Sequence, residues 1–265
     1  MHLFEKDTAL SAQEDMGFRT RIAANWSING VPNGGYLMAI MTGAMQRRSD
    51  REATPLITAN FLSRCEPGEA LVTVEKIAQS NQFVRFQSSL IQAGDERIRA
   101  IGTFANWLQK CPVDRYESTA PALPPPADCV LIPPLPNYSL FEHMEIRLDP
   151  GCAGWMTSGQ LAEKSEIRGW IRFKDERPFD LAAILLISDS FPPPVLSTQG
   201  MVAWVPTIEF SVSVRNLPQS SWLKGFFRTR YITCGLLAED GELWDAENRL
   251  VAISRQIAQS RYLSL

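Results

Sequence analysis

One carboxylate stands where an apolar segment ends. The stretch ILLISDSF (residues 184–191) has four aliphatic side chains, then Ser188, Asp189 and Ser190, and three prolines follow it. An unpaired charge inside a protein costs several kcal/mol or shifts its pKa. Asp189 therefore either reaches water at a chain exit, where aspartate is common, or stays inside for chemistry such as proton abstraction. These residues alone leave both interpretations open.

A second polar side chain stands among small residues near the C-terminus. Strand alternation in LVAISRQIAQ (250–259) places Gln256 on the face that also carries Ala252, Ser254 and Ala258. A buried glutamine needs hydrogen-bond partners or belongs to a site. The first half of the chain has Phe104 at the corresponding position, so only the second half would have kept polar chemistry.

Histidine chemistry has few candidates. The chain has two histidines, His2 and His143. A Ser-His-Asp hydrolase, a His-ligated metal site or a His-Asp dehydratase would all have to use His143. That residue is predicted to lie within a strand, so a dehydratase or hydratase is disfavoured. The motifs G-x-S-x-G, G-x-G-x-x-G and G-x-x-x-x-G-K do not occur.

Composition excludes several classes of function. A formal net charge of -3 provides no basic surplus for a nucleic-acid backbone. No apolar run approaches the length of a membrane span. Five scattered cysteines without a C-x-x-C pair indicate reduced thiols in a cytoplasmic protein.

A proline-rich stretch divides the chain into two halves. Residues 110–136 contain eight prolines, which disfavour helices and central strands. We therefore predict an N-terminal domain over 1–109, a linker over 110–136 and a C-terminal domain over 137–265. RIRAIGTF (97–104) and RLVAISRQ (249–256) occupy similar places in the two halves. Together with a repeated Thr-x-x-Phe, they indicate an internal duplication.

Each half is predicted to contain one buried helix and several strands. The helices are expected over 36–48, where apolar residues occur nearly all round, and over about 179–190. The strands are expected near 18–26, 56–64, 70–79, 82–92, 97–108, 138–148, 163–174, 204–215, 222–235, 236–245 and 249–261. A helix that is apolar all round must be buried, and a sheet that wraps around it achieves this. Two such units with joined sheets give an α+β fold.

Four features together resemble a known family. Trp26 is followed by Pro32-x-Gly34-Gly35-Tyr36, and Ser188-Asp189 falls late in the second helix. Pro206-Thr207-x-x-Phe210 opens a strand, and Val251-Ala252-x-x-x-Gln256 lies in the last one. Their order and spacing are similar to those of the acyl-CoA thioesterase II family, in its thioesterase-like branch of double-hotdog proteins. The resemblance covers about residues 17–261 and implies a tandem hotdog fold.

The resemblance also implies a reaction. Members of this family hydrolyse acyl-CoA thioesters with activated water and without a covalent intermediate. Position by position, their catalytic residues correspond to Asp189, Thr207 and Gln256. The implied substrate is an acyl-CoA of lipid metabolism, with no metal and no cofactor. Double-hotdog chains also often pair further, so a homo-oligomer is possible.

Two site assignments and the function itself each have an alternative interpretation. Gly35 and Tyr36 open the first helix, either as a packing device or as substrate-binding residues whose free N–H groups polarise a thioester carbonyl. Alternation places Thr207 with Glu209 on a polar face that could be solvent. The same fold could also serve as a non-catalytic module that binds acyl-CoA or an acyl carrier.

Overall fold

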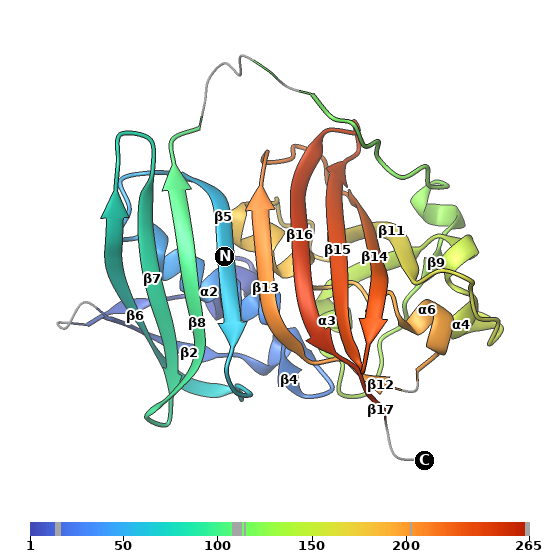
Figure 1. Cartoon of the computed structure of the whole chain (residues 1–265), viewed down its shortest axis with the longest axis horizontal. Coiled ribbons are helices and arrows are strands. Elements are labelled where there is room, and N and C mark those ends of the chain that lie inside the picture. The colour runs from blue at the N-terminus through green and yellow to red at the C-terminus, as the bar shows by residue number, and fades with distance from the viewer. Residues whose placement is uncertain (14–16, 108–112, 114, 202, 263–265) are drawn as a thin grey trace.

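The computed structural model describes all residues except 14–16, 108–112, 114, 202 and 263–265 (Figure 1). Within the described part, thirteen strands form one sheet in the order β1-β2-β6-β7-β8-β5-β13-β16-β15-β14-β11-β10-β9, with every pair antiparallel. The first six strands of this order come from the N-terminal half and the other seven from the C-terminal half. The predicted α+β tandem fold with joined sheets is confirmed.

The N-terminal half supplies one side of the sheet. Its strands are β1 (Ser11–Ala12), β2 (Gly17–Ile22), β5 (Ala53–Phe61), β6 (Gly68–Gln79), β7 (Val84–Gln92) and β8 (Asp95–Ala105). A two-residue turn joins β7 to β8, and Ala93 and Gly94 both have positive φ, 54° and 87°. This is the type I′ geometry, which matches the twist of paired strands.

The C-terminal half repeats this arrangement. Its strands are β9 (Val130–Leu131), β10 (Met144–Leu148), β11 (Glu166–Phe173), β13 (Thr207–Val214), β14 (Leu223–Thr233), β15 (Leu236–Asp245) and β16 (Leu250–Gln259). The β14–β15 turn again has two residues with positive φ, Cys234 at 51° and Gly235 at 78°. The halves meet where β13 pairs with β5, with Phe210 opposite Ala59.

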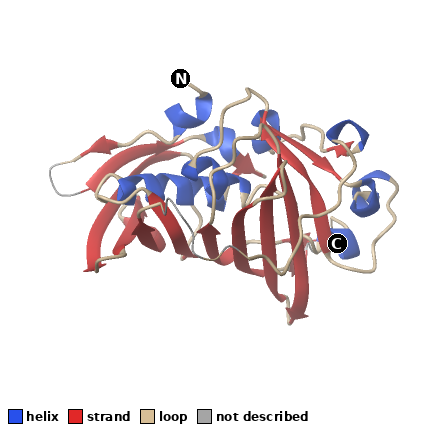
Figure 2. Ribbon diagram, turned by 90° about the horizontal axis from the view of Figure 1, so that it is seen from above, coloured by secondary structure: helices blue, strands red, loops and turns tan. Residues whose placement is uncertain are grey.

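Two buried helices lie against the sheet. Helix α2 (Gly34–Gln46) is predominantly apolar and almost wholly buried, and it contacts β6, β7, β8 and helix α5 (Leu181–Ile187). Burying each large aliphatic side chain contributes about 1.5–3 kcal/mol. In Figure 2 the long helix lies along one face of the curved sheet. The start of α2 and the end of α5 therefore lie inside the protein, where they can hold polar groups.

The remaining elements are short. They are α1 (Leu3–Asp7), η1 (Ala24–Trp26), β3 (Ser27–Ile28), β4 (Val31–Pro32), η2 (Pro126–Asp128), α3 (Leu140–His143), η3 (Pro150–Cys152), α4 (Gly154–Thr157), α6 (Leu196–Gln199), β12 (Ala203–Trp204) and β17 (Arg261–Tyr262). The prediction of one strand over 138–148 was wrong in its first half. His143 instead ends helix α3, and its ring packs 5.2 Å from Trp26. No described helix has the length and apolarity that a membrane crossing requires.

The described part of the proline-rich stretch packs along the C-terminal half. Trp170 donates a hydrogen bond of 2.8 Å to the carbonyl of Pro124. Strand β9 lies inside the predicted linker and pairs with β10 at the edge of the sheet. This agrees with the expectation that prolines exclude central strands. The bounds of the three predicted segments stay a prediction.

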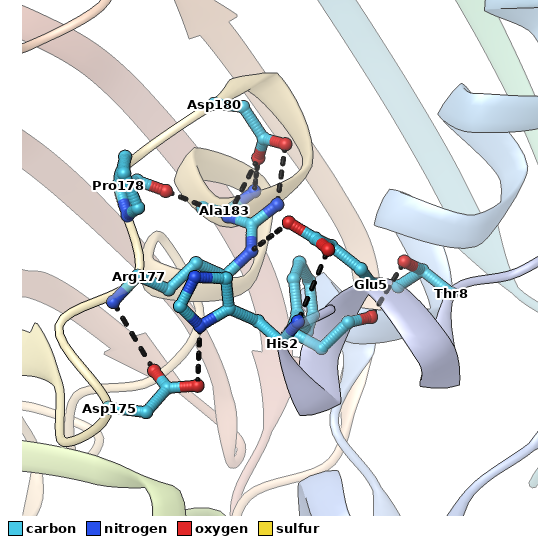
Figure 3. Close-up of polar contacts among 9 residues, drawn as sticks. His2, Glu5, Thr8, Asp175, Arg177, Pro178, Asp180 and Ala183 are labelled. Carbon is cyan, nitrogen blue, oxygen red and sulfur yellow. Dashed lines mark hydrogen bonds and ion pairs between the residues drawn. The ribbon is translucent and has the colours of Figure 1, made fainter.

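A buried arginine fixes the beginning of α5. The Arg177 side chain is 5% exposed and forms ion pairs with Asp180 at 2.6 Å and with Glu5 of α1 at 3.7 Å (Figure 3). Asp180 is also the N-cap of α5 and accepts a hydrogen bond from Ala183 N. The N-terminal helix therefore braces the start of the helix whose far end carries Asp189.

Candidate active site

Asp189 follows α5 and lies against the first turn of α2. Its Oδ2 accepts a hydrogen bond of 3.0 Å from Gly35 N and another of 3.0 Å from Asn33 Nδ2. The same Asn33 amide donates to the Asp189 carbonyl at 2.6 Å. The first N–H groups of a helix lack intrahelical partners, and the helix dipole favours negative charge there. The carboxylate is therefore kept inside, with partners for its charge.

Asn33 orients this arrangement from both ends of its side chain. It is the N-cap of α2, and its Oδ1 accepts a hydrogen bond from Tyr36 N at 3.0 Å. This bond fixes the amide so that Nδ2 points to Asp189. Sequence reasoning missed Asn33 because the helix was predicted to begin at residue 36, although asparagine is a preferred N-cap residue and marks the observed start of the helix.

The pKa of Asp189 reflects two opposing effects. Burial raises the pKa from its ordinary value of 3.8 to about 6, because desolvation penalises the ionised form. Hydrogen bonds from the backbone of Gly35 and Gly34 and from the Asn33 side chain act in the opposite direction. The result is a carboxylate that ionises near neutrality, as a general base requires.

Gly35 lets the two central helices approach each other. A Cβ at this position would overlap the carbonyl oxygen of Leu185 and lie 3.0 Å from Asp189 Cβ. In the structure the Gly35 N–H is donated to Asp189, so it is not free. The glycine therefore serves packing and the orientation of the carboxylate together.

Replacing Gly35 with alanine is expected to lower the free energy of unfolding by about 1–3 kcal/mol, because the added methyl group forces the helices apart. Denaturant unfolding measures the effect. Gly43→Ala is the matched control on the same helix. Its Cβ would meet only Leu10 Cδ1, at 3.6 Å, and alanine favours helix by about 1 kcal/mol. Equal unfolding midpoints for the two variants would contradict the close-approach argument.

Tyr36 is placed away from the Asp189 carboxylate. The side chain is fully buried, and its hydroxyl donates to the carbonyl of Asp7 at 2.7 Å and accepts from Ala23 N at 3.0 Å. Burial raises the pKa of the phenol. These contacts occupy the hydroxyl and favour a packing role for Tyr36. Its contact with substrate stays a prediction.

Thr207 and Gln256 are joined directly. Gln256 Nε2 donates a hydrogen bond to Thr207 Oγ1, and Gln256 is 9% exposed. A β-bulge between Thr207 and Glu209 shifts the register, so that Thr207 pairs with Ala258, which faces the interior. Simple alternation placed Thr207 with Glu209 on a polar face. The bulge instead turns the hydroxyl inward.

A second carboxyl group lies beside the Thr207–Gln256 pair. Among the described residues, no hydrogen bond links Asp189 to Thr207 or Gln256. Glu239, however, lies opposite Gln256 across β15 and β16. Burial raises the pKa of Glu239 well above its ordinary value, and the charges of Asp189 and Asp240 raise it further. Sequence reasoning missed this glutamate, although alternation along β15 places it on the same face as two buried leucines, Leu237 and Leu243.

Solved structures with the same fold span the whole length of the chain. A Thermobifida fusca protein provisionally called thioesterase II aligns with a TM-score of 0.90 and 22% identity, over 98% of each chain. A hot dog fold protein of unknown function from Alicyclobacillus acidocaldarius gives 0.89 and 22%, over 100% of each chain. An acyl-CoA thioesterase II of Mycobacterium marinum gives 0.76 and 19%, over 98% of this chain and 99% of its own. At these identities the likeness establishes the fold.

Sequence comparison establishes the family. Among curated protein sequences, none matches the chain. The family model for the acyl-CoA thioesterase N-terminal domain matches residues 22–105, and the model for the C-terminal domain matches residues 117–259. The second match alone covers more than half of the chain. The two matches follow each other in the order that the tandem fold requires, and the chain belongs to the acyl-CoA thioesterase family.

Proposed function

We propose that this chain hydrolyses acyl-CoA thioesters with a water molecule that Asp189 activates. The observation that carries the proposal is the anchoring of this carboxylate at the first turn of α2. Gly35 N and Asn33 Nδ2 both donate to its Oδ2, and neither donates to Oδ1. One oxygen is therefore oriented by the protein, and the other is available to a water proton.

The chemistry follows from this arrangement. Asp189 takes a proton from the water as its oxygen attacks the thioester carbonyl carbon. The tetrahedral intermediate then breaks its C–S bond and releases the carboxylic acid and the thiol of CoA. Gln256 donates to the Thr207 oxygen, which leaves the Thr207 hydrogen free to bond to the water or to the developing oxyanion. The scheme uses no metal or redox cofactor.

The pH dependence has a definite sign. Asp189 acts as a base only when it is ionised, and its pKa is about 6. We expect kcat/KM for acyl-CoA to rise with pH through about 6 and to fall roughly tenfold per pH unit below it. Initial rates measured from pH 4.5 to 7.5 test this. A rate that is constant across this range would exclude Asp189 as the base.

Steady-state hydrolysis of a panel of acyl-CoAs, from acetyl to palmitoyl, tests the proposed function. Release of the CoA thiol gives turnover, and calorimetric titration of the same thioesters gives binding. Turnover of at least one member supports the proposal. Tight binding without turnover would instead favour a non-catalytic module that holds acyl-CoA or an acyl carrier.

The cellular location, the metabolic role and the oligomeric state stay predictions. The scattered cysteines predict reduced thiols in a cytoplasmic protein, and the four described cysteines are free thiols. A role in lipid metabolism and a homo-oligomeric state rest on the resemblance to the family and are proposed on that basis.

A further inference from the structure

A row of four side chains crosses the inner face of the C-terminal sheet. Phe210 on β13 lies opposite Gln256 on β16, Gln256 lies opposite Glu239 on β15, and Glu239 lies opposite Thr229 on β14. Residues directly opposite each other in antiparallel strands share a face, with Cβ atoms about 4.5–5.5 Å apart. Phe210, Gln256 and Thr229 are 1%, 9% and 7% exposed. The register therefore holds Glu239 on the interior side, between an amide and a hydroxyl.

Two members of this row lack protein partners. Thr229 Oγ1 is buried without a hydrogen bond from any described residue. The half-buried Glu239 carboxyl forms neither a hydrogen bond nor an ion pair with any described residue. Buried polar groups in proteins are nearly always hydrogen-bonded. Thr229 Oγ1 is an exception to this rule, and the unpaired Glu239 carboxyl lies next to it and next to Gln256. The two groups therefore indicate polar atoms that are reserved for a ligand.

The N-terminal half provides an internal comparison. RIRAIGTF and RLVAISRQ align Phe104 with Gln256. Phe104 lies opposite Val84 across β8 and β7, and both side chains are buried. The same cross-strand pair is thus apolar in one half and Gln256–Glu239 in the other. A sheet of this kind does not need a carboxyl group here for folding, which favours a functional reason for Glu239.

The surroundings of Glu239 favour its neutral form. Burial is the largest cause of its raised pKa, followed by the charges of Asp189 and Asp240. The neighbouring strands present Thr229 and Gln256 to it, and neither titrates. Asp189, with a pKa of about 6, has hydrogen bonds that favour its ionised form, whereas no hydrogen bond or ion pair from a described residue favours the ionised form of Glu239. The arrangement therefore suits a pair of carboxyl groups of which one accepts a proton and the other donates a hydrogen bond.

We propose that Glu239 is a hydrogen-bond donor of the active site, whose carboxyl group donates to the thioester carbonyl oxygen as negative charge develops there. The inference rests on the proposed hydrolysis. As water attacks, the π electrons of the C=O bond move onto this oxygen, and the Glu239 O–H stabilises them. When the C=O bond re-forms, the C–S bond breaks, and the proton held by Asp189 neutralises the departing thiolate. Glu239 keeps its own proton throughout.

Two substitutions separate donation from packing. Glu239→Gln keeps the shape and an N–H donor, so it is expected to retain most of kcat. Glu239→Met keeps the volume without a donor and is expected to lower kcat about 10²- to 10³-fold, as for loss of one oxyanion donor. The wild-type rate should also fall at alkaline pH as Glu239 ionises, whereas Glu239→Gln should not show this fall. Glu69→Gln, at an exposed residue of β6, is the matched control.

Two kinetic results would contradict the proposed role of Glu239. Equal kcat for Glu239→Met and the wild type, or the same alkaline fall in Glu239→Gln as in the wild type, would overturn the inference. If the wild type hydrolyses no acyl-CoA, the proposed function is wrong and the kinetic comparison gives no information about Glu239. Infrared spectroscopy of the resting protein then shows whether Glu239 is protonated.

The spectroscopic arm uses the resting protein. A difference spectrum of wild type against Glu239→Gln at neutral pH is expected to contain the C=O band of a protonated carboxylic acid. In Asp189→Asn that band should disappear at a lower pH, because the negative charge that raises the pKa of Glu239 has been removed. Absence of the band at neutral pH would overturn the inference, whatever the activity.

Discussion

Asp189→Asn is expected to lower kcat for acyl-CoA hydrolysis by about 10²- to 10⁴-fold, the usual contribution of general base catalysis. Asparagine has the same shape, and its amide oxygen can still accept from Gly35 N and Asn33 Nδ2. It cannot, however, take a proton from water. Binding of acyl-CoA should change little, because the substitution removes a proton acceptor and not a contact surface. Steady-state kinetics with a titrated Kd measures both effects.

Asp189→Asn is expected to lower activity without lowering the stability of the protein. The folded protein raises the pKa of Asp189 from 3.8 to about 6, so it binds more protons than the unfolded chain between these values. The stabilising contribution is therefore complete below pH 4 and is lost as the pH rises through 6. Asp189→Asn avoids this loss, and its Tm at pH 7.5 should equal or exceed that of the wild type.

Asp95→Asn is the control for this experiment, because Asp95 is exposed at the start of β8. It should leave kcat and Tm unchanged. If kcat for Asp189→Asn stays within a factor of about three of the wild-type value, Asp189 is not the general base. A strongly lowered Tm would mean that the carboxylate is a structural group, and the kinetic loss would then not identify a base.

Gln256→Leu is expected to lower kcat about 10²- to 10³-fold, in the range measured for loss of one oxyanion donor. The substitution removes the amide that holds Thr207 Oγ1 and leaves that hydroxyl without its partner. Gln259→Leu makes the same change at an exposed position of the same strand and should leave kcat unchanged. Equal rates for both variants would show that the buried amide has only a packing role.

A double substitution tests whether Thr207 and Gln256 act as a unit. Thr207→Val removes the hydroxyl at nearly constant volume. Residues that share a hydrogen bond are not additive, so Thr207→Val combined with Gln256→Leu should lose little more than Gln256→Leu alone. If the fold-loss of kcat in the double variant equals the product of the two single fold-losses, the residues act separately.

Sequence alone predicted the fold well because both halves repeat the same local signals. Turn residues such as Ala93-Gly94 mark the hairpins, and an apolar helix without a polar face demands a covering sheet. Helix 36–48 was predicted two residues late, because Asn33 caps the helix and Gly34 already begins it. His143 was misplaced because the short helix α3 is followed at once by a strand.

The candidate site was only partly accessible from sequence. Asp189 attracted attention because a carboxylate ended an apolar segment, but its partners Asn33 and Gly35 come from a helix more than 150 residues away. Such contacts depend on tertiary packing, which periodicity does not encode. The inward turn of Thr207 depends on a β-bulge that simple alternation cannot represent. Glu239 could have been found, because alternation applied to β15 places it among buried leucines.

The central claim is that water, and not the carboxylate itself, attacks the thioester. A single turnover of acyl-CoA with enzyme in excess, in water enriched in oxygen-18, tests it most directly. The account predicts one oxygen-18 atom in the acid released by that first turnover and no label in the protein. Acid that carries only unlabelled oxygen, with the label found in Asp189, would show that the carboxylate is a nucleophile and would contradict the account.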